Sequence, residues 1–233
     1  MRWKIIVVNA GIVLIVGILS YVLLAASLGD VVANPAKRKT EVSQALRAAA
    51  AQLALDGARS ERWLDSKIAT DGVKGVFAGG TTEARQQAAT AAANKIRDEA
   101  VADATFTKMA PSIVVFVDKS GVVLGRNGSN LMRGDKLGAA YPSLTAALAS
   151  GNTASDVWLN RERQEQVLAS YAPVRGDDGA VIGAVVLATP LNDDRLSRTS
   201  ELTSGQFLAL SVPGGQLELV ASSGGGSNLI DAV

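Results

Sequence analysis

The sequence predicts an α+β protein with an N-terminal transmembrane helix, a long amphipathic helix and a five-stranded antiparallel sheet with helices on one face. Three observations carry this prediction. Residues 5–28 form an apolar run without a single charge. Residues 37–69 place apolar side chains at helical spacing, and five β-branched runs separated by turns then follow. An antiparallel sheet that packs helices against a face is the economical arrangement for this order.

The apolar run at residues 5–28 is long enough to cross a bilayer, which takes about 20 residues in a helix. Arg2 and Lys4 precede it, so residues 1–4 are expected to form a cytoplasmic tip. A cleavable signal peptide is the alternative, although its apolar region is usually only about 7–15 residues long. Residues 29–36 form a juxtamembrane joint, in which Asn34 and Pro35 end the membrane helix.

The segment 37–69 predicts an amphipathic helix roughly 50 Å long at about 1.5 Å per residue. Its thin stripe comprises Val42, Leu46, Ala49, Leu53, Ser60, Leu64 and Ile68. This stripe suits packing on another helix or a second subunit, and part of it must also pack on its own domain. Gly57 is a weak point in the helix. After a glycine-rich loop at 71–80, Thr81 or Thr82 caps a second helix that runs to about residue 103.

After this helix, the spacing of the apolar residues changes from that of a helix to that of strands. Expected strands lie at residues 112–117, 122–126, 153–159, 166–174 and 180–190. Residues 118–121 and 175–179 are turns, because Asp and Gly stand where tight turns need them. A polar loop at 127–140 leads into a short helix at 141–150. A helix at 192–202, capped by Asn192, follows the last strand.

Residues 206–233 repeat the beginning of this pattern. Two apolar runs at 206–212 and 216–222 flank Pro213-Gly214-Gly215 and resemble the first hairpin. An isolated hairpin is marginally stable in water. Either the chain is therefore part of a longer protein whose second module starts here, or the hairpin extends the first sheet.

Composition excludes several kinds of chemistry. The chain has no Cys and no His, which rules out disulfides, Cys/His zinc sites and Ser-His-Asp triads. Its formal net charge of +1 does not give the strong positive electrostatic field that would attract nucleic acid. Asp177 and Asp178 stand together in a hairpin tip, where adjacent side chains diverge, so we expect no metal site there. We also expect no cofactor.

The order and spacing of these segments resemble an extracellular Cache domain, the PAS-like sensor module of bacterial transmembrane receptors. The resemblance rests on IVVFVDKSGVVLGR, on GDKLGAAYPSLTAALASGNTASDVWL and on VLASYAPVRGDDGAVIGAVVLATPLNDDRL. The C-terminal LALSVPGGQLELVASS resembles the opening of the second module of a double Cache receptor. The aromatic, Arg and Asp set of the amino-acid-binding Cache group is not seen, so amino acids cannot be carried over as the ligand.

The resemblance implies an extracytoplasmic sensor at residues 37–191 and a linking helix at 192–205, both held outside the bacterial inner membrane. It also implies a small-molecule ligand, with a carboxylate as one candidate. A homodimer is expected, together with a cytoplasmic output domain absent from this chain.

Six residues are candidate ligand contacts, each with an ordinary alternative. They are Arg126, Arg133, Tyr141, Trp158, Tyr171 and Thr189. Paired guanidinium groups suit a carboxylate, but solvated surface arginine is the alternative. Trp158 shares a strand face with Asp156 if its neighbours face the core, and core packing is the alternative for the aromatic residues. Lys136 is a weaker candidate.

Two other functions remain open at this point. A bitopic scaffold of a bacterial envelope or secretion machine also combines one anchor, a long helix and a small α+β domain, and it needs no pocket. An enzyme would need a Ser-Lys or paired-carboxylate arrangement, and no such motif is found in the sequence.

Overall fold

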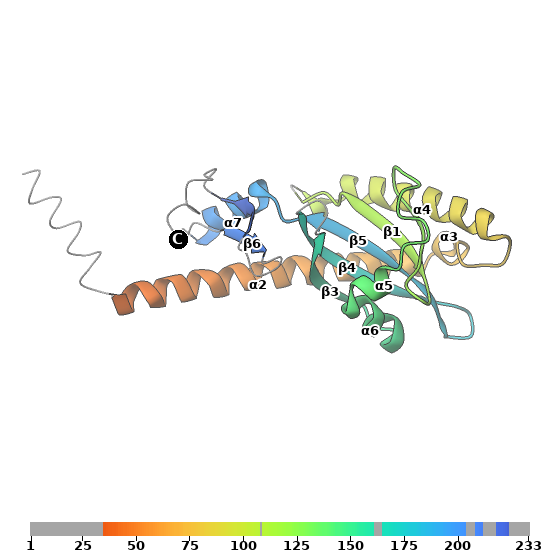
Figure 1. Ribbon diagram of the computed structural model, residues 1–233, viewed down its shortest axis with the longest axis horizontal. Coiled ribbons are helices and arrows are strands. Elements are labelled where there is room, and N and C mark those ends of the chain that lie inside the picture. Colours follow the sequence, from red (N-terminus) through yellow and green to blue (C-terminus); the bar gives the residue numbers. More distant parts are fainter. Residues whose placement is uncertain (1–34, 108, 161–164, 204–207, 212–217, 224–233) are drawn as a thin grey trace, which may run out of the picture. The chain divides into compact units, whose positions relative to one another are not determined.

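The computed structural model describes residues 35–107, 109–160, 165–203, 208–211 and 218–223 (Figure 1). The predicted membrane segment at 5–28 lies outside these residues. Within them, no helix combines the length and the apolar character needed to span a membrane. The chain divides into two units, residues 1–47 and 48–233, and the features below lie in the second unless stated.

Helix α2 (Pro35–Ile68) confirms the long helix. Its predicted stripe is buried only toward its C-terminal end, at Ser60 and Leu64. Val42 and Leu46 are 59% and 58% exposed. Gly57 lies close to strand β3 (Ala154–Asn160), since a Cβ on Gly57 would lie 3.1 Å from Cβ of Ser155. The predicted weak point is therefore a contact site.

Two shorter helices follow α2. The glycine-rich loop at 71–80 contains a one-turn helix, α3 (Asp71–Lys74), that the sequence pattern did not reveal. Helix α4 (Thr82–Ala102) is capped as expected, because Thr81 Oγ1 accepts a hydrogen bond of 3.2 Å from the Ala84 N–H. Its buried face consists of Ala89, Ala93, Ile96 and Ala100. These small side chains let the helix lie close to the sheet. A 3-10 turn, η1 (Ala104–Phe106), then leads toward the first strand.

The five predicted strands all form, with ends within two residues of expectation. They are β1 (Ile113–Asp118), β2 (Val123–Arg126), β3 (Ala154–Asn160), β4 (Glu165–Arg175) and β5 (Val181–Pro190). Their order is β2-β1-β5-β4-β3, and every neighbouring pair is antiparallel. Strand β5 is therefore central.

Helices cover both faces of the sheet, so the expectation of helices on one face was wrong (Figure 1). One face packs against α2, α3 and α4 through residues such as Phe116, Val185 and Leu187. The other packs against α5 (Leu137–Ala140) and α6 (Pro142–Ser150) through residues such as Val186. The physical reason is visible in β5, where residues on both faces are apolar and buried, so each face needs a cover.

Helix α7 (Asp193–Thr203) leaves the sheet after β5, and Asn192 caps it as predicted, since its Oδ1 accepts a 3.1 Å hydrogen bond from the Arg195 N–H. Strands β6 (Leu208–Ser211) and β7 (Glu218–Ser222) pair with each other in a separate two-stranded sheet. The alternative that this hairpin extends the first sheet was therefore wrong for the described residues.

Asp103 gives a testable acid dependence of folding. Its carboxylate accepts hydrogen bonds from the Thr105 N–H at 2.8 Å and the Trp63 indole N–H at 3.0 Å. The hydrogen bonds from Thr105, followed by that from Trp63, lower the pKa of Asp103 below its ordinary value of 3.8. A lowered pKa in the folded state stabilises the fold above pH 3.8, and this contribution is lost as the pH falls through the folded pKa.

We therefore expect Asp103→Asn to be less stable than the native chain in urea unfolding at pH 7. The difference should shrink as the pH falls below 3.8 and through the lowered folded pKa of Asp103, because a protonated Asp103 is as neutral as the asparagine. A difference in unfolding midpoint that stays constant from pH 7 to pH 3 would contradict this role of the charge.

Candidate functional site

A pocket of about 1020 Å³ lies between the second face of the sheet and the segment that contains α5 and α6. The pocket is partly open to solvent. Its floor is apolar and comes from three adjacent strands, with Val115 of β1 opposite Val186 of β5, and with Val167 and Ala188 at the same end of the sheet. Period-two alternation in these strands sends these side chains to one face.

Three stacked aromatic rings form one wall of the pocket and its support. The Tyr141 ring lies flat on Trp158, with ring centroids 4.0 Å apart and an interplanar angle of 4°. Behind Trp158 lies Tyr171, with a centroid separation of 5.7 Å and an angle of 19°. Only Tyr141 and Trp158 line the pocket, and Tyr171 is buried beneath them. Offset and stacked rings of this kind stabilise a site beyond the area they bury.

Hydrogen bonds fix the rings of this stack. The Trp158 indole N–H donates to Ser143 Oγ of α6 at 3.3 Å, and the Tyr141 hydroxyl donates to the Leu159 carbonyl oxygen at 3.3 Å. Burial raises the pKa of Tyr141 and of Tyr171 above the ordinary value of 10.0. Both phenols are therefore neutral near pH 7, and the Tyr141 hydroxyl keeps the proton that it donates to Leu159.

Charged side chains stand at the rim. Arg126 and Lys136 contribute positive charge from the β2–α5 side, and Asp135, Asp156 and Glu165 contribute negative charge. Arg126 is half-buried, and its Nε donates to the Asn127 carbonyl oxygen at 3.2 Å. Lys136 is exposed. A ligand in the pocket would therefore meet an apolar floor, an aromatic wall and a rim of mixed charge.

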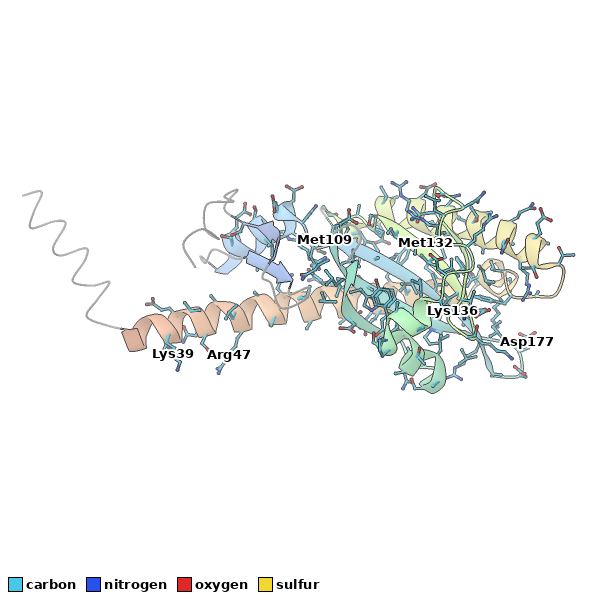
Figure 2. The ribbon with its side chains drawn as sticks, in the orientation of Figure 1. Lys39, Arg47, Met109, Met132, Lys136 and Asp177 are labelled. Atoms are coloured by element: carbon cyan, nitrogen blue, oxygen red, sulfur yellow. The ribbon has the colours of Figure 1, made fainter. Side chains whose placement is uncertain are left out.

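Met132 shapes the segment that carries Lys136. Its φ of 76° is the one positive value at a non-glycine residue in the described part of the chain, and such a conformation is uncommon outside Gly, Asn and Asp. Its sulfur lies 3.5 Å from Nη1 of Arg126. Figure 2 labels Met132 and Lys136 on this segment. Backbone strain of this kind gathers at functional sites.

The structure brings together some of the predicted ligand contacts and separates others. Arg126, Tyr141 and Trp158 line the pocket together with Lys136. Arg133 points elsewhere, because its Nη2 donates to Thr90 Oγ1 of α4 at 3.0 Å. Thr189 is buried and shares the face of β5 that carries Val185 and Leu187, opposite the pocket.

Sequence reasoning missed Ser143 and Met132 as part of the site. Ser143 sits directly after the proline that begins α6, and nothing local shows that its hydroxyl reaches the indole of a later strand. Trp158 is 6% exposed, whereas Val157 beside it is 39% exposed. The condition that Val157 faces the core was therefore not met, although Trp158 and Asp156 do both line the pocket.

The described residues contain no group of three or more Asp or Glu placed to hold a metal ion. The chain also has no Cys or His to add to such a group. What the pocket offers chemically is burial of an apolar or planar group, hydrogen bonding and charge at its edge.

No protein-family model matches the chain, and no curated protein matches its sequence. Solved structures do match its fold. The sensor domain of the histidine kinase DctB from Vibrio cholerae aligns with a TM-score of 0.54 and 10% identity, over 79% of this chain and 64% of that domain. The chain thus spans less than two thirds of that domain's length.

The periplasmic domain of LuxQ from Vibrio cholerae aligns with a TM-score of 0.50 and 13% identity, over 79% of this chain and 80% of that domain. At these identities the similarity concerns the fold. The chain has the fold of periplasmic sensor domains of bacterial receptors, as its resemblance to PAS-like Cache modules predicted.

Proposed function

We propose that this chain is the extracytoplasmic sensing module of a transmembrane signalling receptor, and that it binds a small molecule in the pocket beside Trp158. The observation that carries this proposal is the pocket itself. It is about 1020 Å³ in volume and opens beneath α5 and α6 in a fold shared with the DctB and LuxQ sensor domains. Pockets of about 300–1,000 Å³ are typical of small-molecule sites.

A small carboxylate with an apolar or planar body is the proposed ligand class, and it would pair with the two cations of a rim that also holds Asp135, Asp156 and Glu165. Arg126 and Lys136 place two cations at the rim, and guanidinium groups pair with carboxylates in bidentate geometry. Val115, Val186 and the ring of Tyr141 offer apolar surface to the rest of the molecule. Tyr171 acts through Trp158 in this proposal. Arg133 and Thr189 act only from outside the pocket.

The proposal includes the parts of a receptor that lie beyond this module. Residues 5–28 anchor the chain in the bacterial inner membrane with the sensor outside, and residues 206–233 begin a second module. The exposed Val42 and Leu46 of α2 pair with a second copy. A cytoplasmic output domain completes the proposed receptor. Ligand binding then shifts a two-state equilibrium and biases the output.

The scaffold alternative is not favoured, because a purely structural domain needs no pocket and the pocket is present. The similar structures are likewise sensor domains of receptors and not enzymes.

A thermal-shift screen tests the proposal. The full chain, in detergent micelles, is heated with small mono- and dicarboxylates and with the neutral amide of each as a matched control. A carboxylate at 100 times its dissociation constant stabilises the fold by about 2.7 kcal/mol, which raises the unfolding midpoint by about 5–10 °C. The amides should give less. No shift by any compound, with the fold intact, would contradict small-carboxylate sensing.

The rim lysine offers a sharper check. Lys136→Gln is expected to weaken binding of the stabilising carboxylate by about tenfold, because it removes one charged hydrogen bond worth about 1.4 kcal/mol. Lys95→Gln is the matched control, since Lys95 is an exposed lysine of α4, which covers the opposite face. Equal affinities of the two variants by titration calorimetry would rule out a role for Lys136.

A further inference from the structure

A buried ion pair joins α2 to α7. Asp56 of α2 is 2% exposed and Arg195 of α7 is 6% exposed. Arg195 Nη2 donates to Asp56 Oδ2 at 2.9 Å, across 139 residues of sequence. Gln52 Nε2 donates to Asp56 Oδ1 at 3.0 Å, and Arg198 Nη2 lies 3.6 Å from Oδ2. Gln52, Asp56, Arg195 and Arg198 are called the polar latch below.

The polar latch is poorly explained as a source of stability alone. Removing two charges from water costs free energy that their attraction repays only with full hydrogen bonding. Here Arg195 Nη1 is buried and has no hydrogen-bond partner among the residues that the structure describes. Burial also lowers the pKa of Arg195, and the Asp56 carboxylate opposes that shift. A buried pair of this kind instead selects one arrangement of the elements that carry it, because its hydrogen bonds require defined positions of both helices.

The latch lies where the pocket floor ends. Helix α7 follows β5 directly, and Ala188 near the end of β5 lines the pocket. Arg198 Nη2 also contacts the sulfur of Met109, in the segment that leads to β1 and its pocket residue Ile113. Figure 2 labels Met109 near the end of the sheet from which α7 leaves. Ile113 and Ala188 are paired across β1 and β5. A shift of this end of the sheet therefore moves both chain segments that connect the sheet to the latch.

We propose that the polar latch is the conformational link between the pocket and α2. The latch holds α7, which follows the last strand of the sheet, against α2, and displacement of this end of the sheet weakens that contact. The ligand part of this statement rests on the proposed function. The latch part does not, because docking of α7 on α2 can be measured without any ligand.

Hydrogen exchange of the full chain in detergent micelles tests the latch. In Asp56→Asn the amides of residues 193–203 should exchange at least tenfold faster than in the native chain, while those of β4 and β5 keep their protection. Asp65→Asn is the matched control, an exposed carboxylate on the same helix, and should leave α7 unchanged. Unchanged exchange of α7 in Asp56→Asn would overturn the latch, and so would equal loss of protection in β4 and β5.

A milder variant keeps the test decisive if Asp56→Asn fails to fold. Arg198 is partly exposed, so Arg198→Gln should fold and raise exchange in α7 at least threefold. Arg62→Gln, an exposed arginine on α2, should have no such effect. Exchange in α7 equal to that of the native chain in Arg198→Gln would overturn the latch.

The link to the pocket needs its own readout. The chain has no cysteine, so Ala140→Cys places a single thiol on the pocket lining. If the latch and the pocket are coupled, the rate of thiol modification by a small maleimide should change at least threefold when Arg198→Gln is added, since coupling is reciprocal. An unchanged rate with α7 loosened would overturn the link and leave ligand binding, tested by the thermal shifts, unaffected.

Discussion

Replacing Gly183 by alanine should destabilise the fold by about 3 kcal/mol, at the upper end of what overpacking usually costs. Gly183 lies in the central strand β5 and pairs with Asp118 and Val174 on its two sides. A Cβ there would stand 2.2 Å from Cε1 of Phe77 and 2.4 Å from the Val117 carbonyl oxygen. The ring of Phe77 can turn away, but the Val117 oxygen belongs to the backbone of β1. Relief therefore requires the β1–β5 pairing to shift.

The measurement is the urea-unfolding midpoint, with Gly72→Ala as a matched control. Gly72 lies in the one-turn helix α3, and a Cβ there meets nothing within 4 Å. Alanine at Gly72 should leave the stability unchanged or raise it by about 0.5–1 kcal/mol, because glycine loses more backbone entropy than alanine on folding. Equal midpoints for the two variants would show that the close approach at Gly183 carries no strain.

The sequence predicts the strands and turns because their signals are local. The turn before β2 shows this. The carboxylate of Asp118 accepts hydrogen bonds from the Ser120 and Val122 N–H groups, and Gly121 has a φ of 77°. Asp and Gly at those two positions are what the turn requires, and both can be read from neighbouring residues. The cap of α4 by Thr81 was readable for the same reason.

Which helices cover the sheet, and which way the side chains point, depends on residues far apart in the sequence. Both features were therefore harder to predict from the sequence. A one-residue step along a strand reverses the face, so Thr189 lies opposite the pocket while Ala188 lines it. Arg133 follows the strained Met132 and turns toward Thr90 of α4. No local pattern reveals such a contact.

The polar latch is the extreme case, because Asp56 and Arg195 are 139 positions apart. Each reads as an ordinary surface charge on its own helix until the helices are placed together. Pocket residues drawn from β2, α5 and β3 depend on tertiary structure in the same way. Sequence reasoning thus reached the strands and four of the pocket residues, including the weaker candidate Lys136, but not the contacts between helices.

Trp158→Ala should destabilise the fold by about 3–5 kcal/mol, the usual cost of truncating a buried Trp or Phe. The indole is 6% exposed and lies between the rings of Tyr141 and Tyr171. Its loss removes both stacking contacts and the hydrogen bond from the indole N–H to Ser143 Oγ. The neighbouring Val157→Ala is the control, since Val157 is 39% exposed, and should change the stability by less than about 0.5 kcal/mol. Urea unfolding measures both.

Trp158→Phe separates the two contributions of this residue. A phenyl ring keeps a stacking surface for Tyr141 but cannot donate to Ser143, so the cost should fall to about 1–2 kcal/mol. If the pocket holds a ligand against this wall, the Phe variant should keep most of the ligand-induced thermal shift. The Ala variant should unfold at a lower midpoint, and the ligand should no longer raise that midpoint. Loss of stability without loss of that shift in Trp158→Ala would assign the stack to the core alone. The aromatic wall would then contribute no binding surface to the pocket.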